Sequence, residues 1–248
     1  MARWYFHFWR IRKRDLLLLS LILGILYFGY STYMDRLTVS AIKAMSWSIA
    51  NRVIVIDPGH GGIDPGAVGK TGTLEKDINL EVAKKLQVLL SQAGAAVILT
   101  RDSDVDLADP DTSGLLTKKR QDLSRRVAIA NERNAHIYLS IHVNSFPLSK
   151  WSGAQTFYQR GQPAGKKLAE AVQFELVRVL KNTKRVAKGM DFFTNRETKM
   201  ASATVEIGFM SNPKEEALMQ QEEYQAKLAY AIFAGIVKFF AEEGVQSR

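Results

Sequence analysis

Two histidines follow apolar, strand-like runs of the chain, and a glutamate lies between them. His60 stands in the turn that ends VIVIDPGHGG, and His142 stands in LSIHVNS. Glu75 lies in GTLEKDINLEVAKKL, two residues before the point where the apolar pattern predicts that a helix begins. Two neutral imidazoles and one carboxylate are a usual ligand set for a catalytic zinc ion, which keeps its fourth position for water. These residue types therefore predict a zinc hydrolase site held by His60, Glu75 and His142.

Each of the three residues also has a plainer interpretation. A histidine after a strand is often a hydrogen-bonded structural residue, and a glutamate at a helix start is favoured by the helix dipole. The surrounding glycines are expected to give the turn its backbone freedom; they are Gly59, Gly61 and Gly62. The zinc hypothesis depends on the three side chains meeting in one place.

A fourth candidate is a carboxylate inside a predicted strand. Glu206 lies in SATVEIGFMSNP, between Val205 and Ile207. Burial of an unpaired carboxylate is costly, so we expect Glu206 to face a partner such as a metal-bound water. In that place it would act as the catalytic base. The alternative is a buried salt bridge with one of the basic residues.

The remaining histidines and nearby polar residues give weaker signals. His7 precedes a long apolar segment. His136 opens the same predicted strand as His142 and is expected at its opposite end, in a structural role. Three further polar residues are expected either to orient substrate or to stabilise turns; they are Asn144, Ser145 and Ser211.

One loop is rich in aspartate. The segment DSDVDLADPD, from Asp102 to Asp111, has five aspartates in ten residues. Its spacing lacks the glycine and the terminal glutamate of an EF-hand calcium loop. We therefore expect a solvated insertion rather than a calcium site.

From residue 51 onward, apolar runs alternate with amphipathic segments. This alternation predicts an α/β fold with a single catalytic domain, whose mostly parallel central sheet is flanked by helices. Ligand sites of such sheets lie beyond the carboxyl ends of the strands, where His60 and His142 would meet. Strands are predicted at 53–56, 95–100, 137–141, 153–159 and 203–208, and helices at 77–93, 117–133, 164–180 and 222–240.

The N-terminal region contains a candidate membrane span. Leu16–Met34 carries no formal charge and follows five basic residues, which predicts a transmembrane signal anchor with a cytoplasmic N-terminus. A cleaved signal peptide is the main alternative; the length of the run and the missing Ala-x-Ala site argue against it. The expected organisation is a basic cytoplasmic tail over 1–15, the anchor over 16–34, a stalk over 35–50 and an extracytoplasmic catalytic domain over 51–242.

The composition of the chain excludes several kinds of site and of binding partner. The chain has no cysteine, which excludes disulfides, thiolate zinc sites and cysteine nucleophiles. Residues 51–248 hold 27 basic and 23 acidic side chains, a net charge of +4 that suits an anionic wall or membrane surface. No arginine-rich helix or aromatic-basic motif is visible, so no nucleic-acid partner is expected.

Three linked motifs resemble those of a known family. VIVIDPGHGGIDPGAVGKTGTLEKDINLEVAKKL, SIHVNS and VEIGFMSNP, in that order, resemble the zinc-dependent N-acetylmuramoyl-L-alanine amidases of the amidase-3 family. The resemblance extends from about Val53 to Phe240. It places His60, Glu75 and His142 on the metal ligands and Glu206 on the catalytic glutamate.

The resemblance has one departure. Where the family usually has an apolar strand and then a proline, FFTNRETKMASATVEIGF has Thr194 and Asn195 at expected apolar positions and Ala201 at the proline. This leaves the four site residues intact, but it puts in doubt the pairing of the sheet near residues 192–204.

The resemblance implies a reaction and a substrate. The reaction is hydrolysis of the amide that joins N-acetylmuramic acid to L-alanine in peptidoglycan, with Zn²⁺ activating water and Glu206 moving its proton. Within the family the likeness is strongest to the membrane-anchored, germination-specific branch of spore-forming bacteria, supported by DLADPDT and GAQTFYQRG. That branch implies action on spore cortex, from the forespore intermembrane space, to allow muramic lactam formation. An accessory protein is possible.

Three alternatives stay open at this point. The chain could be a vegetative cell-wall amidase, or another zinc amide hydrolase of the envelope. A non-enzyme alternative is a membrane-anchored wall-binding protein with structural zinc. The absence of an evident fourth protein ligand disfavours that role, because structural zinc sites are usually closed by four ligands.

Overall fold

The structure is a computed structural model that describes residues 12–246. The chain divides into two compact units, with the boundary between Ala44 and Met45. His7 lies outside the described residues, as do Arg3 and Arg10, two of the five basic residues that precede the predicted anchor.

The first unit is helical. Helix α1 spans Lys13–Met45 and includes the whole uncharged segment predicted as the anchor. The described residues contain one helix, over Lys13–Ile49, that is long and apolar enough to cross a membrane by length and composition; a stretch of 18 residues within it has a mean hydropathy of 1.7. The segment expected as a short stalk is therefore mostly a continuation of this helix.

The second unit is built on a six-stranded sheet with strand order β2-β1-β3-β6-β4-β5. All neighbouring strands are parallel except β4 and β6, which are antiparallel. The predicted α/β fold with a mostly parallel sheet is thus confirmed. The strands are β1 (Val53–Pro58), β2 (Ala96–Leu99), β3 (Ile137–Asn144), β4 (Gln155–Tyr158), β5 (Lys188–Gly189) and β6 (Ala201–Phe209).

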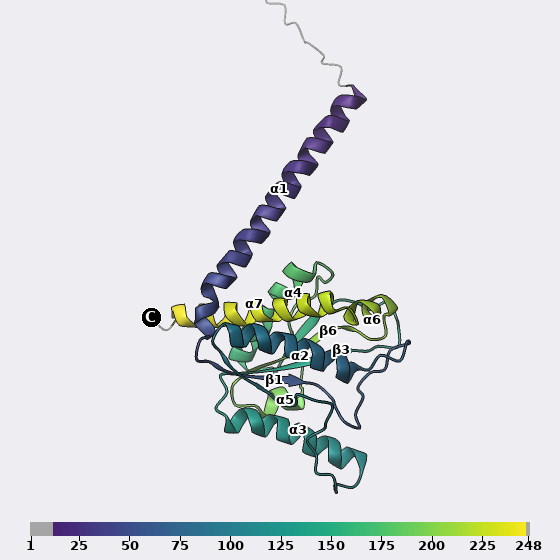
Figure 1. Ribbon diagram of the computed structural model, residues 1–248, viewed down its shortest axis with the longest axis vertical. Coiled ribbons are helices and arrows are strands. Elements are labelled where there is room, and N and C mark those ends of the chain that lie inside the picture. The colour runs from purple at the N-terminus through teal and green to yellow at the C-terminus, as the bar shows by residue number, and fades with distance from the viewer. Residues whose placement is uncertain (1–11, 247–248) are drawn as a thin grey trace, which may run out of the picture. The chain divides into compact units, whose positions relative to one another are not determined.

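Helices cover both faces of this sheet (Figure 1). Helices α2 (Glu75–Gln92), α4 (Pro163–Leu180) and α7 (Glu222–Gln246) lie on one face, and α3 (Leu115–Glu132) and α5 (Phe193–Glu197) lie on the other. Helix α6 (Pro213–Met219) follows β6, and the short 3-10 helix η1 (Ser46–Ile49) precedes β1. Ile49 is fully buried, so this unit begins before residue 51, the predicted start of the catalytic domain.

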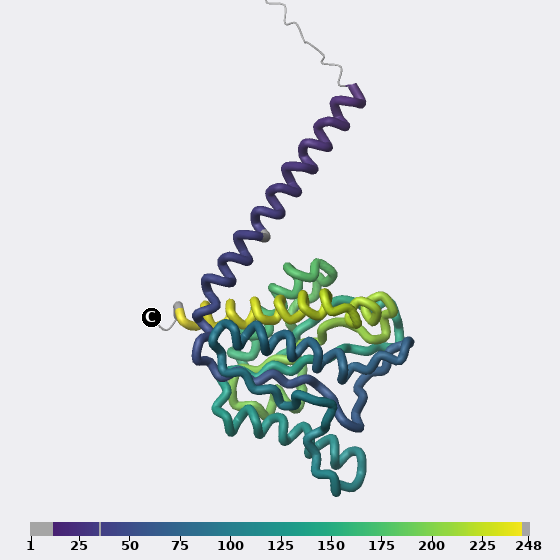
Figure 2. The backbone as a smooth tube through the Cα atoms, viewed as in Figure 1, coloured from purple at the N-terminus to yellow at the C-terminus, as the bar shows by residue number. Residues whose placement is uncertain are grey.

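The apolar runs of the sequence form the buried central strands of the sheet. Ile54, Val55 and Ile56 of β1 are fully buried, as expected for a parallel strand covered on both faces. The backbone trace shows β1 and β3, which are far apart in the sequence, running side by side (Figure 2). The carboxyl ends of both strands therefore reach the same edge of the sheet.

The region where the family pattern is broken is well paired. Thr194 and Asn195 lie in the short helix α5, which sequence analysis did not predict, and both are buried. The backbone carbonyl of Asn195 accepts a hydrogen bond from Ser202 Oγ at 3.1 Å, and its side-chain oxygen accepts one from Thr204 Oγ1 at 3.4 Å. Strand β6 pairs with β3 from Ala201 onward. The doubt about the sheet near residues 192–204 is therefore removed.

Candidate active site

The two histidines meet at the carboxyl edge of β1 and β3. His60 follows the end of β1 by two residues, and His142 lies near the end of β3. Pro58 pairs with Ile141 across the two parallel strands, which brings the histidines to the same level. Their ring centroids are 4.9 Å apart, with the rings nearly perpendicular.

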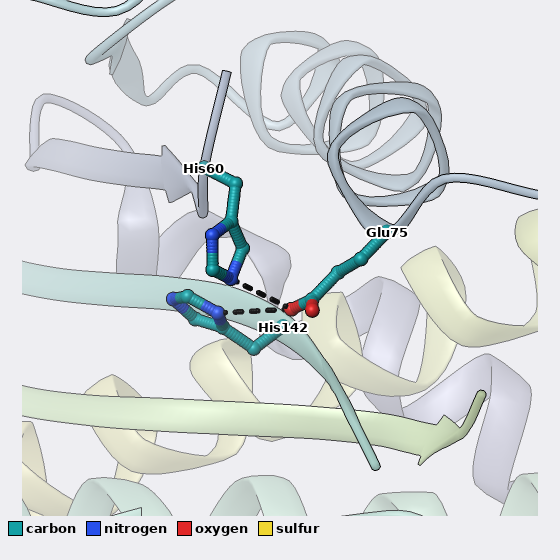
Figure 3. A group of neighbouring side chains, drawn as sticks. All are labelled: His60, Glu75 and His142. Carbon is teal, nitrogen blue, oxygen red and sulfur yellow. Dashed lines mark hydrogen bonds and ion pairs between the residues drawn. The ribbon is translucent and has the colours of Figure 1, made fainter. Parts of the chain in front are cut away.

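Glu75 completes this group (Figure 3). Its Oε1 lies 3.2 Å from His60 Nε2 and 3.1 Å from His142 Nδ1. One ligand atom from each residue falls within 4.8 Å of the others, a group that could hold a metal ion. The structure therefore brings together the three residues that sequence analysis singled out.

The position of Glu75 differs slightly from the prediction. Glu75 is the first residue of α2 rather than two residues before it, and Leu74 forms the extended N-cap. The carboxylate points into the site and accepts hydrogen bonds from the backbone N–H groups of Val143 at 2.9 Å and Ala67 at 2.8 Å. Burial alone would raise the pKa of Glu75, but the contacts with His142 and His60 outweigh it and hold the pKa well below its usual range. The group is therefore an ionised carboxylate.

His60 is held in an unusual backbone conformation by its surroundings. Its φ of 63° lies in the left-handed region, which is uncommon for residues other than glycine. Its Nδ1 lies 3.0 Å from Asp64 Oδ2, which leaves Nε2 directed at Glu75. Burial raises the pKa of Asp64, but the hydrogen bond with His60 brings the pKa down to about 2. Sequence analysis missed Asp64, whose only signal was a carboxylate four residues after the histidine.

Gly59 serves a purpose other than backbone freedom. Its φ is not positive, in contrast to Gly61 and Gly62. A Cβ added at Gly59 would overlap the imidazole ring of His142. Gly59 is therefore required for close approach of the turn to the second histidine.

Glu206 lies beside the three residues, on the next strand. It pairs with His142 in the parallel register of β3 and β6. Its Oε2 is buried and has no hydrogen-bond partner within the described part of the chain. Burial, with a further contribution from the charge of Glu75, raises the pKa of Glu206 to about 7, against an opposing effect of His142. Among residues 12–246 it makes no salt bridge, so the salt-bridge alternative is not supported.

The side chains of His136 and Ser211 have structural contacts. His136 Nδ1 accepts a hydrogen bond from the backbone N–H of Val53 at 3.0 Å, at the opposite end of β3 as expected. Ser211 Oγ accepts a hydrogen bond from Phe146 N at 3.1 Å, and the backbone carbonyl of Asn144 accepts one from Met210 N at 2.7 Å. These bonds join the loops that follow β3 and β6.

The aspartate-rich loop is more than the expected solvated insertion. Asp104 Oδ1 accepts a hydrogen bond from the backbone N–H of Gly62 at 2.8 Å, and Asp104 Oδ2 lies 2.6 Å from Lys76 Nζ. Asp109 is paired with Arg125 at 2.7 Å. The loop is thus attached through Asp104 to the turn that carries His60, and through Asp109 to α3.

A buried ion pair stabilises the turn that carries His60. Asp57, at the end of β1, is paired with Arg126 of α3 at 2.8 Å, and both side chains are almost fully buried. Arg126 also donates to the backbone carbonyl of His60 at 2.7 Å. Burial raises the pKa of Asp57, but Arg126 and the neighbouring hydroxyl donors lower the pKa below its usual range. The turn is therefore held in place by Arg126 of α3.

Comparisons with known proteins agree with this geometry. The family model described as N-acetylmuramoyl-L-alanine amidase matches residues 54–238. The chain is 40% identical over 233 residues to the germination-specific N-acetylmuramoyl-L-alanine amidase of Bacillus subtilis, a match that covers 94% of this chain and 98% of that protein.

Solved structures are similar to about three quarters of the chain. The CwlD amidase from Clostridioides difficile, solved in complex with the GerS lipoprotein, is 41% identical with a TM-score of 0.74, covering 76% of this chain and 98% of that chain. The catalytic domain of CwlV, an N-acetylmuramoyl-L-alanine amidase from Bacillus (Paenibacillus) polymyxa, is 35% identical with a TM-score of 0.67, covering 76% of this chain and 97% of that chain. The chain therefore belongs to the family of N-acetylmuramoyl-L-alanine amidases and is an enzyme of that class.

Proposed function

We propose that the chain is a zinc-dependent amidase in which His60, Glu75 and His142 bind the metal and Glu206 is the catalytic base. The observation that carries the proposal is the convergence of three ligand atoms within 4.8 Å of one another. The buried, unpartnered Oε2 of Glu206 supports a role that needs a partner from outside the chain.

The donor set fits zinc. Two imidazole nitrogens and one carboxylate oxygen are typical of catalytic zinc sites, and they leave one position open. Asp64 holds Nδ1 of His60, as outer carboxylates commonly do for metal-binding histidines. A Cβ at Gly66 would lie 2.6 Å from Glu75 Oε2 and 2.8 Å from His60 Cδ2, so the surrounding backbone is shaped closely around these ligands.

The proposed reaction is hydrolysis of the amide between the lactyl group of N-acetylmuramic acid and L-alanine. Zinc, when bound, supplies a Lewis acid that polarises the scissile carbonyl and acidifies water. Glu206 accepts a proton from the attacking water while the water oxygen bonds to the carbonyl carbon. It then returns the proton to the amide nitrogen as the carbon–nitrogen bond breaks, which releases the stem peptide with a free L-alanine amino terminus.

We assign this activity to the spore cortex. The support is the 40% identity to the germination-specific amidase of Bacillus subtilis, with nearly all of that protein covered. Removal of stem peptides would leave muramic acid free to form the muramic lactam of cortex. Vegetative wall turnover is the second candidate, because it would use the same bond.

The proposed location is outside the cytoplasm, with α1 as the membrane anchor. Its length and apolar composition support this role, and the peptidoglycan substrate of the family lies outside the membrane. The proposed organisation keeps the predicted basic tail over 1–15 on the cytoplasmic side. Protease added to intact protoplasts is expected to digest the catalytic domain and to spare the N-terminal tail; the opposite pattern would reverse the orientation.

The proposal includes an extracytoplasmic accessory protein. The CwlD amidase from Clostridioides difficile was solved in complex with the GerS lipoprotein, which supports such a partner here. Zinc titration of the purified chain alone tests whether the metal site needs the partner. Stoichiometric binding without any partner would limit the accessory protein to a role other than metal loading.

Two experiments test the function. Purified full-length chain, with and without zinc, is incubated with peptidoglycan, and new amino termini are identified. L-Alanine termini that appear only with zinc support the amidase; other termini, or released acetate, would assign an endopeptidase or a deacetylase instead. Spores of a strain that lacks the chain should retain cortex stem peptides and contain no muramic lactam, and a normal lactam content would remove the cortex assignment.

A further inference from the structure

Arg101 joins the two segments that carry His60 and Glu75. It follows β2, contributes no candidate ligand, and is only 3% exposed. Its Nε donates to the carbonyl of Pro58 at 2.9 Å, and its Nη2 donates to the carbonyls of Gly59 at 3.0 Å and Lys76 at 2.7 Å. One guanidinium therefore bonds to the backbone on both sides of the site.

The contacts of Arg101 differ from those of the neighbouring buried arginine. Arg126 is paired with the carboxylates of Asp57 and Asp122 at 2.8 Å each. Within the described residues, the hydrogen bonds of Arg101 all end on carbonyl oxygens, the fourth being that of Ser103 at 3.0 Å. A planar guanidinium with five donors can fix several carbonyls at once, whereas a lysine ammonium cannot reproduce this geometry.

A second link starts three residues later. Asp104 accepts from the backbone N–H of Gly62 at 2.8 Å and contacts Lys76 Nζ at 2.6 Å, while Lys76 Nζ also donates to the carbonyl of Gly62 at 2.9 Å. Arg101 and Asp104 thus connect the His60 turn to the start of α2 at two places. The turn also packs closely on Arg101, because a Cβ at Gly61 would lie 2.9 Å from its Cδ and Nε.

We propose that Arg101 is a positioning residue that sets the separation of His60 from Glu75 and thereby the affinity of the site for zinc. The inference rests on the proposed zinc function. The His60 turn has a left-handed histidine followed by two glycines of positive φ, and a non-glycine residue in this region must be held there by its surroundings. Ligands must be held close to their bound geometry for tight binding, and outer-shell partners supply that order.

The test is the zinc dissociation constant of full-length Arg101→Lys in detergent, measured by chelator competition. We expect zinc to bind about 10-fold to 100-fold more weakly, the range typical of lost outer-shell partners. The matched control is Arg125→Lys, the same change at a half-exposed arginine of α3 that bonds to Asp109 and Leu107, with unchanged affinity. The visible spectrum of the cobalt-substituted protein should change only in the Arg101 variant. Equal zinc affinity and equal cobalt spectra would overturn the inference.

Two further measurements separate the possible failures. Absence of zinc binding by the unchanged chain overturns the proposed function, and the inference with it. If Arg101→Lys does not fold, Asp104→Ala tests the second link between the same two segments. The Asp104 side chain is half-exposed, so its loss should leave the fold intact. We expect it to weaken zinc binding by about 10-fold, the low end of the outer-shell range. Unchanged affinity in a folded Asp104→Ala would show that these links do not position the ligands.

Discussion

Glu206 lies directly across from His142 in the parallel pairing of β6 with β3. The proposed base and one proposed ligand are therefore held at a fixed separation by the hydrogen-bond ladder of the sheet. Burial around this pair leaves Oε2 of Glu206 without a partner in the described chain and raises the pKa of Glu206. A carboxylate placed in this way is costly to keep, which is typical of functional sites.

Replacement of this carboxylate should separate chemistry from metal binding. Glu206→Gln keeps the size of the side chain and removes the proton acceptor, so we expect activity to fall by ~10²-fold to 10⁴-fold while zinc content is unchanged. Peptide release from peptidoglycan and metal content measure the two effects. Glu223→Gln, an exposed carboxylate at the start of α7, serves as the control and should retain full activity. Near-normal activity of Glu206→Gln would make Glu206 a structural residue.

The same substitution should stabilise the zinc-free protein at neutral and higher pH. Because the folded-state pKa of Glu206 is raised to about 7 from an ordinary 4.5, the folded state holds this proton more tightly than the unfolded state. The stability that this bound proton gives to the folded parent is fully present below pH 4.5 and is lost as the pH rises through about 7. It amounts to at most about 3 kcal/mol, from the shift at 1.36 kcal/mol per pKa unit. Glu206→Gln lacks this titration, so its gain in unfolding free energy over the parent should be larger at pH 8 than at pH 5 in urea denaturation. An equal gain at both pH values would contradict the assigned pKa.

The ligand assignment predicts that metal and activity are lost together. His60→Ala and His142→Ala should each bind little zinc and release no stem peptide, because the remaining two ligands are insufficient. His136→Ala is the matched control, since it removes a histidine from the other end of β3 and breaks only the bond with Val53. We expect the control to lose about 1 kcal/mol of stability and to keep its zinc. Full metal content in either site variant would remove that residue from the ligand set.

Gly59 gives an independent test of the same site. In Gly59→Ala the new methyl group overlaps the His142 ring, so the imidazole or the turn must shift from its present position. We expect zinc affinity to fall by at least the ~10-fold typical of disturbed ligand geometry, with helix content by circular dichroism preserved. Gly24→Ala, where the added atom meets no neighbour within 4 Å, should behave as the parent. An undisturbed zinc affinity in Gly59→Ala would show that the turn tolerates the shift.

The sequence was sufficient to predict those site residues that lie in or just after a strand. His60 lies four residues after the apolar run 53–56, and His142 lies near the end of the apolar run that forms β3. These positions indicate the carboxyl ends of two strands, which meet at one edge of a parallel sheet. The buried Glu206 was recognisable because a carboxylate between apolar residues needs a reason. These signals lie within short stretches of the sequence, so they can be recognised without knowledge of the tertiary structure.

The supporting residues could not be found in this way. Asp64, Arg101 and Arg126 are ordinary surface residue types, and their roles depend on which backbone carbonyls and ring nitrogens the fold places near them. The short helix α5 was missed for a related reason. Its polar residue Asn195 is buried and accepts hydrogen bonds from Ser202 and Thr204, a contact that the polar local sequence does not indicate.

The boundary of the catalytic unit gives the last prediction. Ile49 is fully buried within the second unit, and Ser48 Oγ donates to the carbonyl of Val237 in α7 at 3.2 Å. A chain that begins at Met45 should therefore be soluble, folded and able to bind zinc. A chain that begins at Asn51 loses the buried isoleucine, and we expect its unfolding free energy to be lower by about 2–5 kcal/mol, as for other large-to-small changes in a core. Urea denaturation of the two truncated chains measures the difference. Equal stability would place the boundary at residue 51, and insolubility of both would show that α1 is needed for the fold.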